Sequence, residues 1–149
     1  MQHGLAQNKD ENPERPLSDA GTKETSSIAH HLSKISFSPS TIYHSGKTRT
    51  LQTAEILAKS TGIASSKVKP HSQLSPNDDI AQLIPQLQHN ALYIGHLPHL
   101  EKLCAFLLTG KENAGVVQFR NSGVLCLSLD KNEYLINWYL TPEIANISS

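Results

Sequence analysis

The sequence predicts an α/β fold, a three-layer sandwich in which helices cover both faces of a mostly parallel central sheet. Short apolar runs that suit buried strands alternate with longer segments whose apolar residues recur at helical spacing. The alternation stops near the C-terminus, where two strand-like runs lie close together and predict a hairpin. A length of 149 residues suits a single domain over residues 1–149.

The first half of the chain gives the clearest signals. Residues 7–16 are polar and contain two prolines, which predicts an exposed loop. Ser18 is a suitable N-cap for a helix over residues 19–34. Residues 41–44 predict a short strand that ends at a Ser-Gly turn, and the helical spacing that follows stops at Gly62.

In the second half the same alternation continues with weaker signals. Residues 68–74 predict a strand, and residues 80–87 a helix that Pro85 kinks or divides. The continuous apolar run at residues 91–94 is typical of a strand covered on both faces. An amphipathic helix then ends at Gly110. The hairpin strands are predicted at residues 124–129 and 134–140, with the turn at residues 130–133.

The composition indicates a cytoplasmic protein with no preference for nucleic acid or membranes. Thirteen basic and thirteen acidic residues cancel, so any recognition of an anion must be local. No apolar run is long enough to span a membrane, and no secretory signal is present. Cys104 and Cys126 lie among apolar neighbours and are expected to be buried free thiols in a reducing compartment.

Three separate segments contain residues that suit one phosphate site. His3 precedes Gly4, while Ser45, Arg49 and His96 follow predicted strands and open predicted helices. Ligands of open α/β sheets bind at the carboxyl ends of the strands, and a helix N-terminus offers N–H groups to phosphate. A neutral imidazole can attack phosphorus, and Arg49 supplies a donor fork for phosphate oxygens. A protonated His96 would stabilise the developing negative charge. Each residue alone has an ordinary structural explanation, so the prediction rests on their combination.

Histidine is frequent enough to raise the question of a metal site. The eight histidines include the pair His30-His31 and the motif His96-x-x-His99. No carboxylate or cysteine completes a ligand set at a convincing spacing, so neither a metal nor another cofactor is expected. A serine hydrolase is equally disfavoured, because no Gly-x-Ser-x-Gly elbow is present.

The order of these motifs resembles the histidine phosphatase superfamily, whose fold is the phosphoglycerate-mutase-like one, and within it the small bacterial phosphohistidine phosphatases of the SixA type. The resemblance runs along nearly the whole chain. Its matching segments are Gln2-His3-Gly4, Arg15-Pro16-Leu17-Ser18 with Gly21, His44-Ser45 through Arg49 to Gln52-Thr53-Ala54-Glu55, Gly95-His96-Leu97-Pro98-His99-Leu100, Asn137-Trp138, and Thr141-Pro142-Glu143.

The resemblance implies a role for each candidate residue. His3 would be the phosphorylated nucleophile, and Arg49 and His96 would belong to the phosphate pocket. Gln2 and Gly4 of the motif, together with Arg15 at the mouth, would contact the substrate, although a purely structural role for Arg15 is nearly as well supported. Ser45 is a weaker pocket candidate.

Two departures from the family pattern affect the expected activity. The family motif is usually Arg-His-Gly, whereas this chain has Gln2, which donates a hydrogen bond but brings no charge. Loss of one charged donor of this kind costs ~10²–10³ in rate by analogy with an oxyanion-hole donor. The family also places an apolar central strand before the motif, and only Met1 and Gln2 stand there. The first strand is therefore expected to be missing, with Met1 an internal methionine of a longer natural chain.

The expected substrate is phosphohistidine on a protein. Ester hydrolysis benefits from a general acid, and the carboxylates near the expected position are Asp78 and Asp79, which equally suit a helix start. Phosphohistidine demands less, because imidazole is a better leaving group. The resemblance implies a histidine phosphotransfer domain or sensor kinase as partner, and we expect a monomer. Two alternatives remain: a phosphomonoesterase for a small metabolite with Asp79 as the acid, and a catalytically weak phosphohistidine-binding module.

Overall fold

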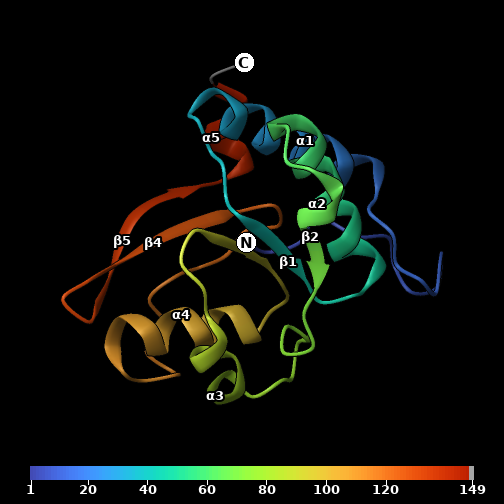
Figure 1. The fold of residues 1–149 in the computed structure, drawn as a ribbon. Helices are drawn as coiled ribbons and strands as arrows, with labels where there is room; N and C mark the ends of the chain where they lie inside the picture. Colours follow the sequence, from blue (N-terminus) through green and yellow to red (C-terminus); the bar gives the residue numbers. More distant parts are fainter. Residues whose placement is uncertain (148–149) are drawn as a thin grey trace.

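A computed structural model describes residues 1–147 and confirms the α/β class (Figure 1). Strand β1 (Thr41–His44) is the middle of a parallel sheet, between β2 (Val68–Pro70) and β3 (Ala91–Ile94). Strands β4 (Val124–Asp130) and β5 (Glu133–Leu140) form the predicted antiparallel hairpin. The hairpin turn uses positive φ angles at Lys131 and Asn132, as a tight two-residue turn requires.

The first three residues connect the sheet to the hairpin. Gln2 forms a parallel bridge with Gly95, just beyond β3, and the Gly95 amide donates to the Met1 carbonyl at 3.1 Å. On the other side, the Gln2 amide donates to the carbonyl of Gly123, at the start of β4, at 3.1 Å. Figure 1 places this end of the chain in the middle of the molecule. Residues 1–3 therefore pair on both sides, with Gly95 and with Gly123, so the part of the expected missing strand that lies next to His3 is present.

Helices cover both faces of the parallel sheet, which gives the three predicted layers. One layer contains α1 (Asp19–Lys34), α2 (Thr48–Thr61) and α5 (Pro142–Ile147), and the other contains α3 (Ile80–Leu83) and α4 (His99–Thr109). The strand residues alternate between these layers. Ile42, Leu92 and Ile94 pack in one core with residues of α1, α2 and α5. Tyr43 and Tyr93 point to the other face and pack with Leu83 of α3 and Leu103 of α4.

Most helix boundaries follow the predicted caps. The Ser18 hydroxyl accepts a hydrogen bond from the Gly21 amide at 3.0 Å, which fixes the start of α1. Helices α2 and α4 are capped at their C-terminal ends by Gly62 and Gly110. Both glycines have positive φ, the left-handed conformation that favours glycine at this position. Pro85 divides the third predicted helix, since α3 ends at Leu83 and a 3₁₀ turn (Ile84–Gln86) follows.

Three local predictions were wrong. Strand β2 is three residues long, because the chain turns away after His71, whose amide donates to the carbonyl of His44. Strand β3 is buried on one face only, since the short α3 leaves Tyr93 and its stacked neighbour Tyr43 half-buried. Cys126 is half-buried on the hairpin, whereas Cys104 is buried; both are free thiols. Helix α5 was not predicted, because six residues are too few for a periodic pattern.

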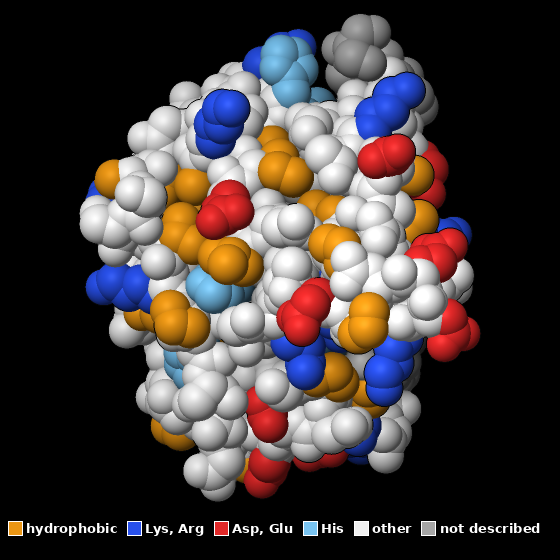
Figure 2. All heavy atoms as spheres, turned by 90° about the vertical axis from the view of Figure 1, so that its right-hand side faces the viewer, with side chains coloured by type: hydrophobic (Ala, Val, Ile, Leu, Met, Phe, Trp, Pro, Cys, Tyr) orange, Lys and Arg blue, Asp and Glu red, His pale blue; other side chains and the backbone are white. Residues whose placement is uncertain are grey.

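The structure bears on two expectations from the composition, one about membranes and one about charge. Among the helices of residues 1–147, none has the length and apolar character needed to cross a membrane. Figure 2 shows one face on which basic and acidic side chains are interspersed, without a large area of one sign. This distribution agrees with the balanced composition.

We expect the substitution Gly21→Ala to destabilise the protein by about 2 kcal/mol or more. A Cβ on Gly21 would lie 2.0 Å from the carbonyl oxygen of Leu5, so α1 would have to move away from the segment that follows Gly4. Denaturant unfolding measures the loss. Thr22→Ala, an exposed change in the same turn, is the matched control, and equal stability of the two variants would contradict this packing.

Candidate active site

Four of the predicted site residues meet at the carboxyl ends of the strands. His3 follows the bridge at Gln2, Ser45 and Arg49 follow β1, and His96 follows β3. The rings of His3 and His96 have centroids 4.9 Å apart, and Arg49 contacts both rings. The side chains therefore converge at the place that an open parallel sheet provides for ligands.

Hydrogen bonds fix the tautomer of His3. Its Nδ1 lies 2.6 Å from the carbonyl oxygen of Gly4, and because a carbonyl only accepts, Nδ1 must hold the proton. Nε2 therefore has the free lone pair, and the Nε–H of Arg49 donates to it at 3.3 Å. Burial lowers the pKa of His3 to about 4, with further contributions from Arg49 and Arg15. His3 is thus a neutral imidazole whose Nε2 faces a cation.

The backbone on both sides of His3 is held from several elements. The His3 carbonyl accepts from the Ser122 amide at 3.1 Å and from the Asn121 side chain at 3.3 Å. The Gly4 amide donates to the hydroxyl of Thr53 in α2 at 3.0 Å. A Cβ on Gly4 would lie 2.5 Å from the Thr25 hydroxyl, so the motif needs glycine there. Sequence reasoning missed Asn121 and Ser122, because residues 111–123 show no periodic pattern.

A directed chain of hydrogen bonds fixes His96. The Thr50 hydroxyl donates to the carbonyl of Lys47 at 2.7 Å, so it must accept from the Ser45 hydroxyl at 3.0 Å. Ser45 in turn accepts from Nε2–H of His96 at 2.7 Å. The unprotonated Nδ1 of His96 then faces Arg49, whose Nη2 lies 3.4 Å away. Ser45, predicted only as a weak candidate, is the direct partner of His96.

Both imidazoles are neutral in the free site. Burial, followed by the charges of nearby groups including Arg49 and Lys47, lowers the pKa of His96 to about 3. The expected protonated form of His96 is therefore absent without a ligand. A bound phosphoryl dianion would raise its pKa, because a nearby negative charge favours the imidazolium.

Two further cations lie near the site. Arg15 has a left-handed backbone, with φ of 48°, and its Nε donates to the Gln7 carbonyl at 3.2 Å. Its charge contributes to the lowered pKa values of both His3 and Arg49. Lys47 is exposed at the N-cap of α2 and was not among the predicted residues. These side chains give the site a local positive field although the chain has no net charge.

The substituted residue of the motif, Gln2, is buried. Only 9% of its surface is exposed, and its Oε1 has no hydrogen-bond partner among residues 1–147. It brings an amide where the family usually has a guanidinium. Its predicted contact with substrate stays a prediction.

The predicted acid, Asp79, lies outside this cluster of contacts. It is exposed and caps α3 by accepting from the Ala81 amide at 2.9 Å, and Asp78 accepts from the Ser75 amide at 2.7 Å. Neither carboxylate forms a hydrogen bond with the site residues named above.

His99 is buried with both ring nitrogens unpartnered within the described chain. No arrangement of three or more potential metal ligands occurs among residues 1–147.

The neutral imidazoles predict a loss of stability in acid. In the unfolded chain both histidines gain protons as the pH falls through 6.5, whereas in the folded protein they stay neutral down to about pH 4 for His3 and about 3 for His96. The unfolded state binds more protons in this window, so the free energy of unfolding falls as the pH is lowered. For His3 alone the loss is at most about 3 kcal/mol.

Denaturant unfolding at neutral pH and near pH 4.5 tests this pH dependence. The variant His3→Asn retains a donor for the Gly4 carbonyl but does not titrate. We expect it to lose less stability on acidification than the unsubstituted protein. Equal losses in the two proteins would contradict a buried neutral His3.

The α/β fold and the convergence of His3, Arg49 and His96 fit the histidine phosphatase pattern that the sequence resembles. In agreement, the model of the histidine phosphatase superfamily (branch 1) matches residues 2–75. The chain belongs to this superfamily of phosphatases, which supports a hydrolase activity. No curated protein matches the chain in sequence.

Solved structures share the fold over nearly the whole chain. The structure of the protein histidine phosphatase SixA complexed with tungstate has 25% identity and a TM-score of 0.80, covering 95% of this chain and 94% of that one. A protein described as phosphohistidine phosphatase SixA from Agrobacterium tumefaciens has 18% identity and a TM-score of 0.78, covering 95% of both chains. Phosphoserine phosphatase from Entamoeba histolytica, in complex with 3-phosphoglyceric acid, has 14% identity and a TM-score of 0.68, covering 93% of both. The last two likenesses concern the fold alone.

Proposed function

We propose that this protein removes the phosphoryl group from phosphohistidine on a signalling phosphotransfer protein, through a covalent intermediate on His3. The observation that carries the proposal is the fixed tautomer of His3. With Nδ1–H bonded to the Gly4 carbonyl, the lone pair of Nε2 points towards Arg49, where a phosphoryl group would bind.

The chemistry follows from this geometry in two steps. Nε2 of His3 attacks phosphorus while the bond from phosphorus to the substrate imidazole breaks, and that imidazole takes up a proton. Water then attacks the phosphorylated His3 and releases inorganic phosphate. Arg49 donates to the equatorial oxygens in both steps, and His96 can become protonated once the dianion is bound.

The choice of a phosphoramidate rests on the side chains around the site. An alkoxide leaving group needs a positioned acid, whereas imidazole is a weaker base and leaves more readily. Asp78 and Asp79 are the carboxylates that lie near the expected position of a general acid in the sequence. Both accept hydrogen bonds from backbone amides around the start of α3, and neither contacts His3. The likeness to the SixA structures supports the same choice. The donor would be a histidine phosphotransfer domain or a sensor kinase.

Parallel turnover assays on two substrate classes test the proposal. One substrate is a histidine phosphotransfer domain phosphorylated with phosphoramidate, and the other is phosphoserine, a phosphomonoester. We expect kcat/KM for the phosphoprotein to exceed that for the ester by about 10² or more, because of the missing acid. Faster turnover of the ester would reject phosphohistidine as the substrate.

The variant Asp79→Asn tests whether the protein is instead a phosphomonoesterase that uses Asp79 as its general acid. If Asp79 were a general acid, ester hydrolysis would fall by about 10² or more in this variant. We expect less than about a threefold change, with a small loss of stability from the weaker helix cap. Tight binding of the phosphoprotein without phosphate release would instead identify a binding module, in line with the uncharged Gln2.

A further inference from the structure

A cleft of about 390 Å³ opens beside α4, and none of its lining residues belongs to the phosphate site. Pro98, Glu101 and Lys102 belong to the start of α4 and form one side, and residues 112–118 form the other. Pro98 lies two residues after His96, whose ring contacts Ser45 and Arg49. The end of the cleft at Pro98 is therefore close to the place where a substrate phosphoryl group would bind.

The wall opposite α4 offers unpaired backbone groups. Residues 111–117 have no helix or strand. Hydrogen bonds hold this segment at its start, where the Lys111 amide donates to the Thr109 hydroxyl at 3.1 Å, and just beyond its end, where the Tyr139 hydroxyl donates to the Gln118 carbonyl at 3.1 Å. The backbone N–H and C=O groups of residues 115–117 form no hydrogen bond within the described part of the chain. Such groups must be satisfied by water or by a partner.

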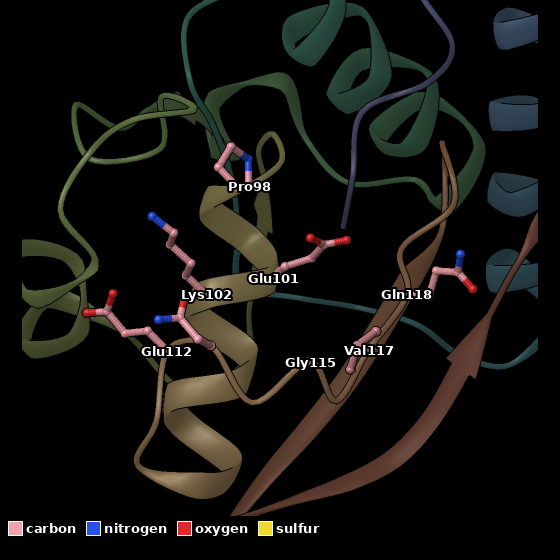
Figure 3. A pocket seen from close by; sticks show the side chains of 8 residues that line it. Pro98, Glu101, Lys102, Glu112, Gly115, Val117 and Gln118 are labelled. Atoms are coloured by element: carbon pink, nitrogen blue, oxygen red, sulfur yellow. The ribbon is translucent and has the colours of Figure 1, made fainter.

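Carboxylates outnumber cations in the lining of the cleft, which contains Glu101, Glu112 and Lys102. Figure 3 shows the Glu101 side chain leaving α4 towards residues 115–118, whereas Lys102 leaves the helix on the other side. Glu101 is half-buried, and no ion pair involves it within residues 1–147. Glu112 adds a second carboxylate at the rim. A half-buried carboxylate without a counter-charge favours a cation from outside.

The apolar residues of the lining indicate which kind of cation would bind in the cleft. Pro98 and Val117 present apolar surface beside Glu101. Lysine and arginine side chains bury their methylene groups against such surface while the charged head meets a carboxylate. A simple metal ion would not use these apolar groups, and too few carboxylates lie together to hold one.

We propose that this cleft binds the surface of the phosphoprotein next to its phosphohistidine, with a lysine or arginine side chain against Glu101. The proposal rests on the proposed function and identifies how the substrate protein is recognised. The phosphoryl group enters the His3 site, and the basic side chain lies along Pro98 and Val117. Free backbone groups of residues 115–117 then bond to polar side chains of the partner.

The test compares a large and a small substrate in charge-reversed variants. The probes are a histidine phosphotransfer domain with a lysine within one helical turn of its phosphohistidine, and free phosphohistidine. For Glu101→Lys we expect KM for the phosphoprotein to rise about tenfold at low salt, while kcat/KM for free phosphohistidine is unchanged. The increase should shrink in high salt. Glu133→Lys, the same charge change at an exposed residue of the hairpin that does not line the cleft, is the matched control.

Reversal of the partner's charge completes the experiment. Substitution of the partner lysine by glutamate should restore the KM of the Glu101→Lys enzyme by about tenfold. Equal KM values for the Glu101→Lys and Glu133→Lys variants would overturn the docking proposal alone. An equal loss on both substrates would also overturn it, since Glu101 would then act on the phosphate site. If the unsubstituted protein released phosphate from neither substrate, the proposed function would fail and docking with it.

Discussion

Replacement of His3 by alanine is expected to abolish phosphate release, by about 10³-fold or more. His3 presents the free lone pair of Nε2 to Arg49 while its Nδ1 is tied to a backbone carbonyl, whereas His96 is held through its Nε2 by Ser45. The measurement is rapid-quench labelling with a ³²P-phosphorylated phosphotransfer domain. Label should appear on the protein in alkali-stable, acid-labile form and should map to His3.

The control for this experiment is another histidine. His89 is exposed and precedes β3, at the end of the strand opposite to the site. His89→Ala should label and turn over like the unsubstituted protein. Persistent label in His3→Ala would mean that another residue forms the intermediate. Phosphate release without any label would indicate direct attack by water.

Replacement of Arg49 by alanine is expected to lower kcat/KM by about 10²–10³. Arg49 donates to both imidazoles, from Nε to His3 and from Nη2 to His96, so it links the nucleophile to the second histidine. Arg49→Lys should recover only part of the activity, because one ammonium group cannot reproduce the two-point fork. Lys59→Ala, which removes an exposed cation from the last turn of the same helix, is the matched control.

The pH profile gives this prediction a second readout. The charge of Arg49 contributes to the low pKa values of His3 and His96. Its removal should raise both values, so the acid limb of the residual kcat/KM should move to higher pH. An unchanged acid limb together with the rate loss would mean that Arg49 contacts substrate without setting the protonation of the imidazoles.

Local chemistry explains which parts of the fold could be predicted. The start of α1 follows from the Ser18 hydroxyl, and the ends of α2 and α4 from glycines with positive φ, so these boundaries need only short-range information. Helix α5 and the short β2 depend on tertiary contacts, and the sequence around them has no distinctive pattern. The half-buried face of β3 likewise depends on how far the short α3 extends.

The same division applies to the site. His3, Arg49 and His96 belong to recognisable segments at strand ends. Asn121 and Ser122 lie in an irregular segment and contact His3 only through its carbonyl, so no spacing rule indicates them. Asp79 was a plausible acid by position, but a carboxylate before a short helix serves equally as its cap, and that contact is the one observed.

The series of hydroxyls behind His96 has a consequence for the source of protons. It ends on the Lys47 carbonyl, which accepts a hydrogen bond but has no proton to give. The hydrogen bonds from His96 through Ser45 and Thr50 therefore end at a backbone carbonyl and do not conduct protons from solvent. This series of hydroxyls therefore supplies no proton to a departing group, and the basicity of that group then governs how readily it leaves. An enzyme built in this manner selects substrates by the leaving group as much as by shape.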